Sequence, residues 1–105
     1  MRVILDECLP RRLVRELSDH SVSTVAQQGW AGIINGELLK RIDGRFEVFL
    51  IIDGNLPAQN KIAGLSFGVV VLRATSNRFA DLKPLVPAVL GAITGIKAGQ
   101  LVFVP

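Results

Sequence analysis

The sequence predicts a single α/β domain whose central, mainly parallel sheet of about five strands is flanked by helices. Segments typical of strands alternate along the chain with segments of helical periodicity, as in domains whose parallel strands are joined by helices. Two strand segments, Arg2–Leu5 and Val48–Ile52, carry continuous apolar runs instead of alternating, as strands buried on both faces do. Half of the 105 residues are apolar, which is enough for one core and supports one domain over residues 1–105.

The first strand, Arg2–Leu5, should lead into a helix. Pro10 suits the first turn of that helix, because a proline there loses no helical hydrogen bond. The helix should end at residues 18–20, and the β-branched residues within 21–25 predict a short second strand. The apolar residues of this first helix recur at helical spacing: Leu9, Leu13, Val14 and Leu17.

A second helix should follow a loop over residues 27–32, which its glycines indicate. Asn35 is a suitable N-cap for this helix, and Asp43-Gly44 should end it. Its apolar face consists of Leu38, Leu39 and Ile42.

The middle of the chain predicts two further strands. Residues 47–52 form the third strand and residues 69–73 the fourth. Between them, Asn55 is a suitable cap for a short third helix, which Gly64 should break. Residues 74–78 then form a polar loop.

The clearest helical stripe begins at Asp81. Pro84 lies near its start, Pro87 lies deeper and should kink the helix, and Gly95 should close it before a fifth strand, Leu101–Val104. The stripe is a core face that is also open to a role in a homodimer. Its members are Leu82, Leu85, Val86, Val89, Leu90 and Ile93.

The most informative feature for function is that two of the apolar strands end on an aspartate. Asp6 follows the first strand and Asp53 follows the third. The carboxyl ends of neighbouring parallel strands form the binding crevice of open α/β sheets, so the two side chains would face each other there. Two carboxylates about 4 Å apart repel by roughly 4 kcal/mol at an effective dielectric of ~20. A proton, an arginine or a metal ion must offset that repulsion.

Oxygen-rich carboxylate sites suit Mg²⁺ or Mn²⁺, and such an ion can activate water and neutralise charge on a phosphodiester. Glu7 and Asn55 are the neighbouring candidates for orienting water around that ion. The alternative interpretation is structural, because an aspartate after a strand often caps a helix or closes a turn, and Asp53-Gly54-Asn55 is ordinary turn chemistry.

Residues 3–10, with the sequence Val-Ile-Leu-Asp-Glu-Cys-Leu-Pro, resemble the opening of the PIN-like domains of bacterial toxin–antitoxin loci. Those domains start with an apolar strand, Asp-Glu, one residue, an apolar residue and proline. Residues 49–56 are similar to their second acidic motif, and residues 59–64 and 69–72 follow its general layout. The resemblance therefore covers nearly the whole chain.

The resemblance implies a three-layer PIN-like domain with an acidic Mg²⁺- or Mn²⁺-binding pocket, endoribonuclease activity on RNA and a small antitoxin protein that masks the site. Asp6 matches the first acidic position of the family and Asp53 the second. Asn55 falls where many related domains carry a further aspartate, so the pocket has fewer acids than is usual. Glu37, from the second helix, is a candidate third metal ligand, or alternatively a favourable partner for the helix dipole.

Basic residues lie close behind the acidic ones, and the net charge of +3 fits a nucleic-acid partner. Arg11 and Arg12, with Arg15, follow the first acidic motif, and Arg73 and Arg78 follow the fourth strand. We expect these arginines to hold RNA phosphates, although those of the first helix could instead form a solvated face.

The remaining features limit the class of protein. The longest apolar runs are too short to span a bilayer, which needs ~20 residues, and the first residues lack a signal-peptide pattern, so we expect a cytoplasmic protein without a membrane partner. The single cysteine, Cys8, excludes an internal disulfide and is expected to be a small buried residue. Trp30 should cover the edge of the core, with base stacking as the alternative.

Two other functions compete with the ribonuclease. Phospho-acceptor receiver domains also carry acids after strands one and three, and Thr75 or Ser76 could supply their hydroxyl. Against this, Lys97 precedes the fifth strand instead of following it, and no closing helix follows Pro105. The second competitor is a catalytically weak or inactive PIN-like domain that binds RNA or a protein partner.

Overall fold

The computed structural model describes residues 1–33, 35–52 and 62–105 of the chain. Its strands are β1 (Arg2–Leu5), β2 (Ser21–Thr24), β3 (Val48–Ile52), β4 (Gly68–Leu72) and β5 (Leu101–Val104). Its helices are α1 (Leu13–Glu16), α2 (Asn35–Ile42), α4 (Phe79–Leu82) and α5 (Val86–Gly95), and a 3₁₀ turn, η1 (Lys83–Leu85), separates α4 from α5.

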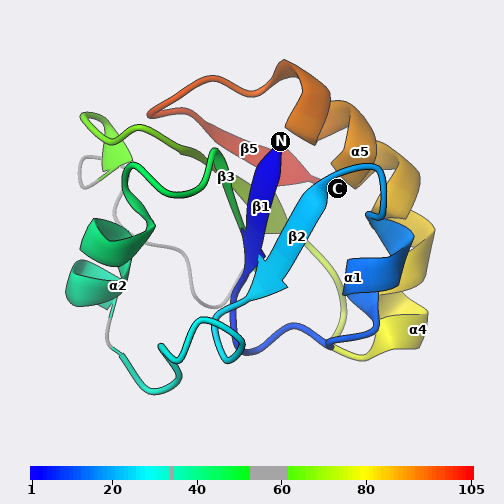
Figure 1. The fold of residues 1–105 in the computed structure, drawn as a ribbon. Helices are drawn as coiled ribbons and strands as arrows, with labels where there is room; N and C mark the ends of the chain where they lie inside the picture. Colours follow the sequence, from blue (N-terminus) through cyan, green and yellow to red (C-terminus); the bar gives the residue numbers. More distant parts are fainter. Residues whose placement is uncertain (34, 53–61) are drawn as a thin grey trace.

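The strands form one five-stranded sheet in the order β2-β1-β3-β4-β5, and every neighbouring pair is parallel (Figure 1). The predicted α/β class and mainly parallel sheet are confirmed. In the centre, Leu5 pairs in register with Thr24 of β2 on one side and with Leu50 of β3 on the other. The chain therefore moves outward from β1 in one direction and then in the other, which makes the β1/β3 boundary the topological switch point of the sheet.

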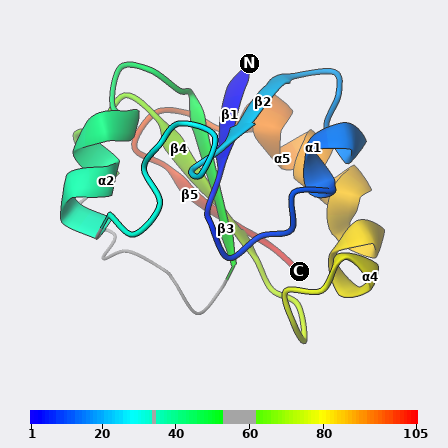
Figure 2. The same ribbon diagram turned by 60° about the horizontal axis from the view of Figure 1, so that its bottom comes forward.

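Helices cover both faces of the sheet, so the domain has three layers (Figure 2). Helices α1, α4 and α5 lie on one face and α2 lies on the other. The central strands supply side chains to both cores alternately, which explains why their sequences are continuously apolar. Completely buried strand residues include Val3, Val48 and Val70 on the first face and Ile4, Ile51, Val69 and Val71 on the second.

The first helix is much shorter than the spacing of its leucines predicts. Leu9, Leu13 and Leu17 are all buried, as predicted, but only Leu13–Glu16 is α-helical. Around this single turn the backbone uses bonds between residues three apart, as from Leu13 N–H to the Pro10 carbonyl at 3.1 Å. Such turns also return side chains to one side, so periodicity predicts which residues are buried better than it predicts helix length.

The prediction of one kinked helix from Asp81 onward is wrong. Pro84 lies inside the 3₁₀ turn and Pro87 lies in the first turn of α5. A proline deep inside a helix would remove a hydrogen bond and clash with the preceding turn, whereas a first turn accepts it. The chain therefore ends α4 and begins a new helix. The predicted third helix falls largely on residues 53–61, which lie outside the described part of the chain.

Contacts far apart in the sequence fix the ends of the sheet. Glu47 receives the Arg2 backbone N–H at 2.8 Å and the Arg2 guanidinium at 2.7 Å, which joins β1 to β3. The backbone hydrogen bond from Arg2, followed by its side-chain hydrogen bond, lowers the pKa of the Glu47 carboxyl.

No helix in the described part of the chain is long and apolar enough to cross a membrane.

Candidate functional site

Asp6 stands at the carboxyl end of β1, at the switch point of the sheet. Its backbone N–H donates to the Leu50 carbonyl of β3 at 3.0 Å, which extends the β1–β3 ladder by one residue. Its own carbonyl accepts the Leu9 N–H at 3.0 Å, which turns the chain away from the sheet. The residue is only 8% exposed, unusual burial for an aspartate. Asp6 therefore places a largely buried carboxylate where open α/β sheets bind their ligands.

Two of the predicted site residues, Asp53 and Asn55, lie outside the described residues. The strand that precedes them is well defined: β3 ends at Ile52, which pairs in register with Leu72 of β4. In the sequence, Asp53 follows Ile52 directly. The predicted pairing of Asp6 with Asp53 stays a prediction.

Glu7 is exposed, and its side chain contacts the loop after β2. The Gly32 N–H donates to Glu7 Oε2 at 3.3 Å. Gly32 has a φ of 81°, a left-handed conformation that glycine adopts without strain. Glu7 thus connects the β1 end to the loop between β2 and α2, and its role in orienting water stays a prediction.

Glu37 lies in the first turn of α2, on the other face of the sheet from α1, and forms an ion pair with Arg41 at 3.3 Å one helical turn later. Its side chain is 51% exposed. Within residues 1–33, 35–52 and 62–105, no group of three His, Cys, Asp or Glu side chains is placed to hold a metal ion. Asp53, with which Glu37 would share the ion, lies outside the described residues, so the role of Glu37 as a third metal ligand stays a prediction.

The predicted arginines divide by what their guanidinium groups contact. Arg12 lies over the Phe79 ring of α4 at 4.2 Å, and Arg73 lies over the Phe103 ring of β5 at 3.9 Å. Both are exposed cations held at defined positions, because the ring face attracts the positive charge. Arg78 is exposed and precedes α4 in extended conformation, with its backbone N–H donating to Ser76 Oγ at 3.1 Å.

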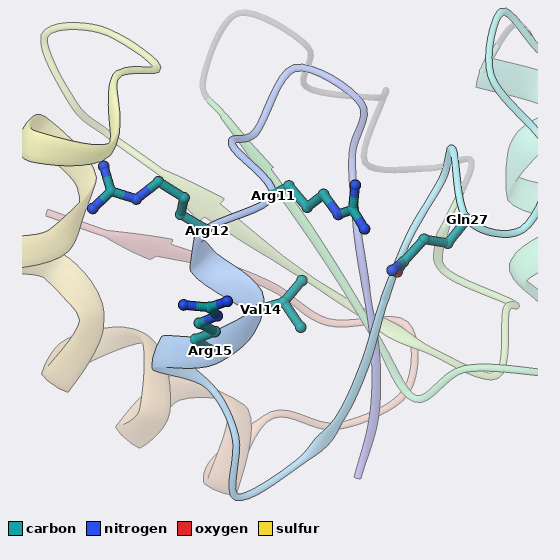
Figure 3. A pocket seen from close by; sticks show the side chains of 5 residues that line it. All are labelled: Arg11, Arg12, Val14, Arg15 and Gln27. Carbon is teal, nitrogen blue, oxygen red and sulfur yellow. The ribbon is translucent and has the colours of Figure 1, made fainter.

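Arg11 and Arg15 instead line a hollow of about 430 Å³, together with Arg12, Val14 and Gln27 (Figure 3). Arg11 follows β1 and Gln27 follows β2, so the hollow lies at the carboxyl ends of these two strands. Sequence reasoning weighed the arginines but missed Gln27, which has no charge and no motif. Only the pairing of β1 with β2 brings it beside Arg11.

The loop after β4 is attached to the loop after β1. Asn77 Nδ2 donates to the Cys8 carbonyl at 3.0 Å, and Ser76 Oγ donates to Asp81, the acidic residue in the first turn of α4. The bond from Asn77 to Cys8 brings the neighbouring Arg78 to the same side of the domain as Asp6. The expectation that Cys8 is buried is wrong, because in the turn after β1 the side chain of Leu9 enters the core and that of Cys8 is exposed.

Trp30 belongs to the core on the α2 face. It is 5% exposed and packs edge-on against Phe46, with 6.3 Å between ring centroids. The predicted covering role is therefore confirmed, and base stacking by Trp30 in this conformation is excluded.

One of the described residues, Asp6, is a buried donor of the kind that magnesium sites use. Mg²⁺ keeps several of its waters and is commonly held by one or two carboxylates together with substrate phosphates. Asp6 supplies one buried carboxylate, and the sequence supplies a second directly after β3.

Comparison of the chain with protein-family models, with characterised proteins and with solved structures finds no match.

Proposed function

We propose that the protein is a Mg²⁺- or Mn²⁺-dependent endoribonuclease of the toxin–antitoxin type, a PIN-like domain that hydrolyses RNA phosphodiesters. The observation that carries the proposal is the position of Asp6, a largely buried carboxylate at the switch point of a parallel sheet, with arginines on the loops around it. The order and spacing of the two acidic motifs in the sequence support the same reaction.

In this proposal Asp6 and Asp53 hold the metal ion, and Glu7 and Asn55 orient water beside it. When bound, the ion supplies an activated water and neutralises charge on the phosphodiester. The chain's own task is to keep the acidic residues in place and to hold the RNA across them. Arg11, Arg12, Arg73 and Arg78 are positioned around the β1, β4 and β5 ends to bind the flanking phosphates.

The proposed partners are an RNA substrate and a small antitoxin protein that covers this acidic edge, and the proposed location is the cytoplasm.

Cleavage of labelled RNA in the presence of Mn²⁺ tests the proposal. Asp6→Asn and Asp53→Asn should each lower the cleavage rate by about 100-fold or more, the effect of removing one electrostatic group from an active site. Asp19→Asn is the matched control, because Asp19 is exposed and lies just before β2, at the amino ends of the strands, whereas Asp6 lies at their carboxyl ends. It should cleave RNA at the wild-type rate, and all three variants should retain the wild-type circular dichroism spectrum.

Wild-type cleavage by Asp6→Asn would refute the proposed site. A wild-type protein that binds RNA with a steep salt dependence but does not cleave it would favour the alternative of an inactive PIN-like binding domain.

The strand order favours one second candidate, a phospho-acceptor receiver-like domain. The order β2-β1-β3-β4-β5 is that of flavodoxin-like open sheets, which bind ligands at the β1/β3 boundary. The polar residues Thr75 and Ser76 follow β4, as a receiver's hydroxyl would. Lys97, however, lies before β5, at the amino ends of the strands, whereas a receiver's lysine follows its fifth strand. Incubation with acetyl phosphate and Mg²⁺ decides between the two, because a receiver gains one phosphoryl group in intact mass and the ribonuclease does not.

A further inference from the structure

The hollow formed by Arg11, Arg12, Val14, Arg15 and Gln27 presents hydrogen-bond donors and positive charge. The three arginines are exposed, and neither Arg11 nor Arg15 forms an ion pair with a described residue. Arg11 reaches toward the turn that carries Gln27, whereas Arg12 reaches toward α4 (Figure 3). The hollow therefore holds cationic groups from two directions without an acidic partner among the residues described.

Gln27 adds a further hydrogen-bond donor to the hollow, because its side-chain oxygen already accepts hydrogen bonds from within the chain. The Thr24 backbone N–H donates to Gln27 Oε1 at 2.9 Å, and the Gln27 backbone N–H donates back to Thr24 Oγ1 at 3.0 Å. Ser23 Oγ also lies 3.4 Å from the same oxygen. The amide group can then offer a ligand only its nitrogen, which is a donor. A ligand of the hollow must accept hydrogen bonds and carry negative charge.

The position of the hollow favours a phosphate group of RNA over an acidic peptide. The hollow lies beside the carboxyl ends of β2 and β1, and Asp6 follows β1, so a polynucleotide that ran along these strand ends over Asp6 would pass the hollow. Guanidinium groups match phosphate oxygens in a planar, two-bond geometry. A peptide partner would ordinarily need an aliphatic or aromatic anchor pocket, and among the described residues that line this hollow only Val14 is apolar.

We propose that this hollow binds backbone phosphates of single-stranded RNA next to the scissile site, with Arg11, Arg15 and the Gln27 amide as the contacting groups. The inference rests on the proposed function and specifies where its substrate lies: on the β2 side of Asp6. The Arg12–Phe79 contact holds the far wall of the hollow in place.

The test measures binding of a fluorescent oligoribonucleotide of about ten nucleotides, a length within the range that single-strand binding sites cover. It uses the Asp6→Asn protein with EDTA, so that cleavage cannot interfere. Adding Arg11→Gln and Arg15→Gln together should raise the Kd about tenfold at low salt. It should also reduce the salt slope by about 1.4, since each neutralised phosphate of a single strand contributes ~0.7.

A control variant removes the same charge from other parts of the surface. Lys40→Gln with Lys97→Gln removes two exposed cations, one on α2 and one in the loop before β5, and should change the Kd less than about twofold. Gln27→Glu keeps the acceptor for Thr24 but replaces the donor with an anion, so it should weaken RNA binding.

Equal weakening by the two double variants would overturn the proposal, because it would show a general charge effect. Tighter binding of a polyglutamate peptide than of RNA, lost on replacing Arg11 and Arg15, would overturn it in favour of an acidic protein partner. Full displacement of RNA by millimolar inorganic phosphate would overturn it in favour of a free-phosphate site. These outcomes are separate from those for the ribonuclease, because cleavage by the wild type against Asp6→Asn is measured independently of binding.

Discussion

Gly68 is a position where the structure predicts a large effect of one added methyl group. The residue begins β4, and its N–H donates to the Glu47 carbonyl at 2.9 Å. A Cβ built on its backbone would lie 2.7 Å from two side-chain carbons of Ile96 and 2.8 Å from the Lys97 carbonyl oxygen. Carbon atoms pack at 3.5–4.0 Å, so both contacts are strongly repulsive. The Ile96 side chain can rotate away, but the Lys97 oxygen belongs to the backbone of the turn before β5.

We therefore expect Gly68→Ala to lower the free energy of unfolding by about 2–3 kcal/mol, the upper part of the range for overpacked sites. For a domain of this size, this corresponds to a fall of roughly 8–20 °C in Tm. Urea denaturation followed by circular dichroism measures the change directly, with the slope of the transition expected to stay constant.

Two further variants test the reason for the loss. Gly91 lies on the exposed side of α5, and an added methyl group there would have no atom within 4 Å. Gly91→Ala should therefore stabilise the protein by about 0.5–1 kcal/mol, because alanine has the higher helix propensity. Combining Gly68→Ala with Ile96→Val removes one of the two clashing carbons and should recover part of the loss. If Gly68→Ala unfolds at the wild-type urea concentration, the close approach of β4 to the turn before β5 is refuted.

Three further outcomes are expected. Glu47→Gln should be less stable than wild type by about 0.5–1 kcal/mol at pH 7. The loss is small because the Arg2–Glu47 ion pair is exposed to solvent, which screens it. Because the folded pKa of Glu47 is lowered, the stabilisation is fully present above the ordinary pKa of glutamate, and the difference should close as the pH of the urea titrations falls through the lowered folded pKa. Phe79→Leu should weaken RNA binding about twofold, as Arg12 loses its ring contact, measured by anisotropy. EDTA should abolish RNA cleavage, and added Mn²⁺ should restore it.

The sequence predicts the layers of this domain because its periodicity reports burial directly. The central strands β3 and β4 have no polar positions and β1 has only Arg2 at its start, since both of their faces meet helices. Leu38, Leu39 and Ile42 mark the inner face of α2. The same signal fails for helix length. Leu9, Leu13 and Leu17 are buried at helical spacing, but only one turn between them is α-helical, because three-residue turns satisfy the same burial pattern.

The candidate site divides in a similar way. Asp6 could be singled out from sequence alone, because a charged residue directly after an apolar strand falls at the strand end where ligands bind. Glu37 stays a predicted third ligand, and the fold adds that its side chain forms an ion pair with Arg41 on α2. Gln27 could not be found at all, because its chemistry depends on the bonds that Thr24 makes to it.

Hydrophobic patterning along the chain was sufficient to predict the α/β class, a mainly parallel sheet of about five strands and the acidic residue that follows β1. These follow from local rules, since burial of each face depends on residues two to four positions apart. Strand order was decided by the tertiary structure alone, because no local pattern states which strands pair. That order places β2 beside β1 and β3 on its other side, and so brings Arg11 to Gln27 and Asp6 to the centre of the ligand-binding edge.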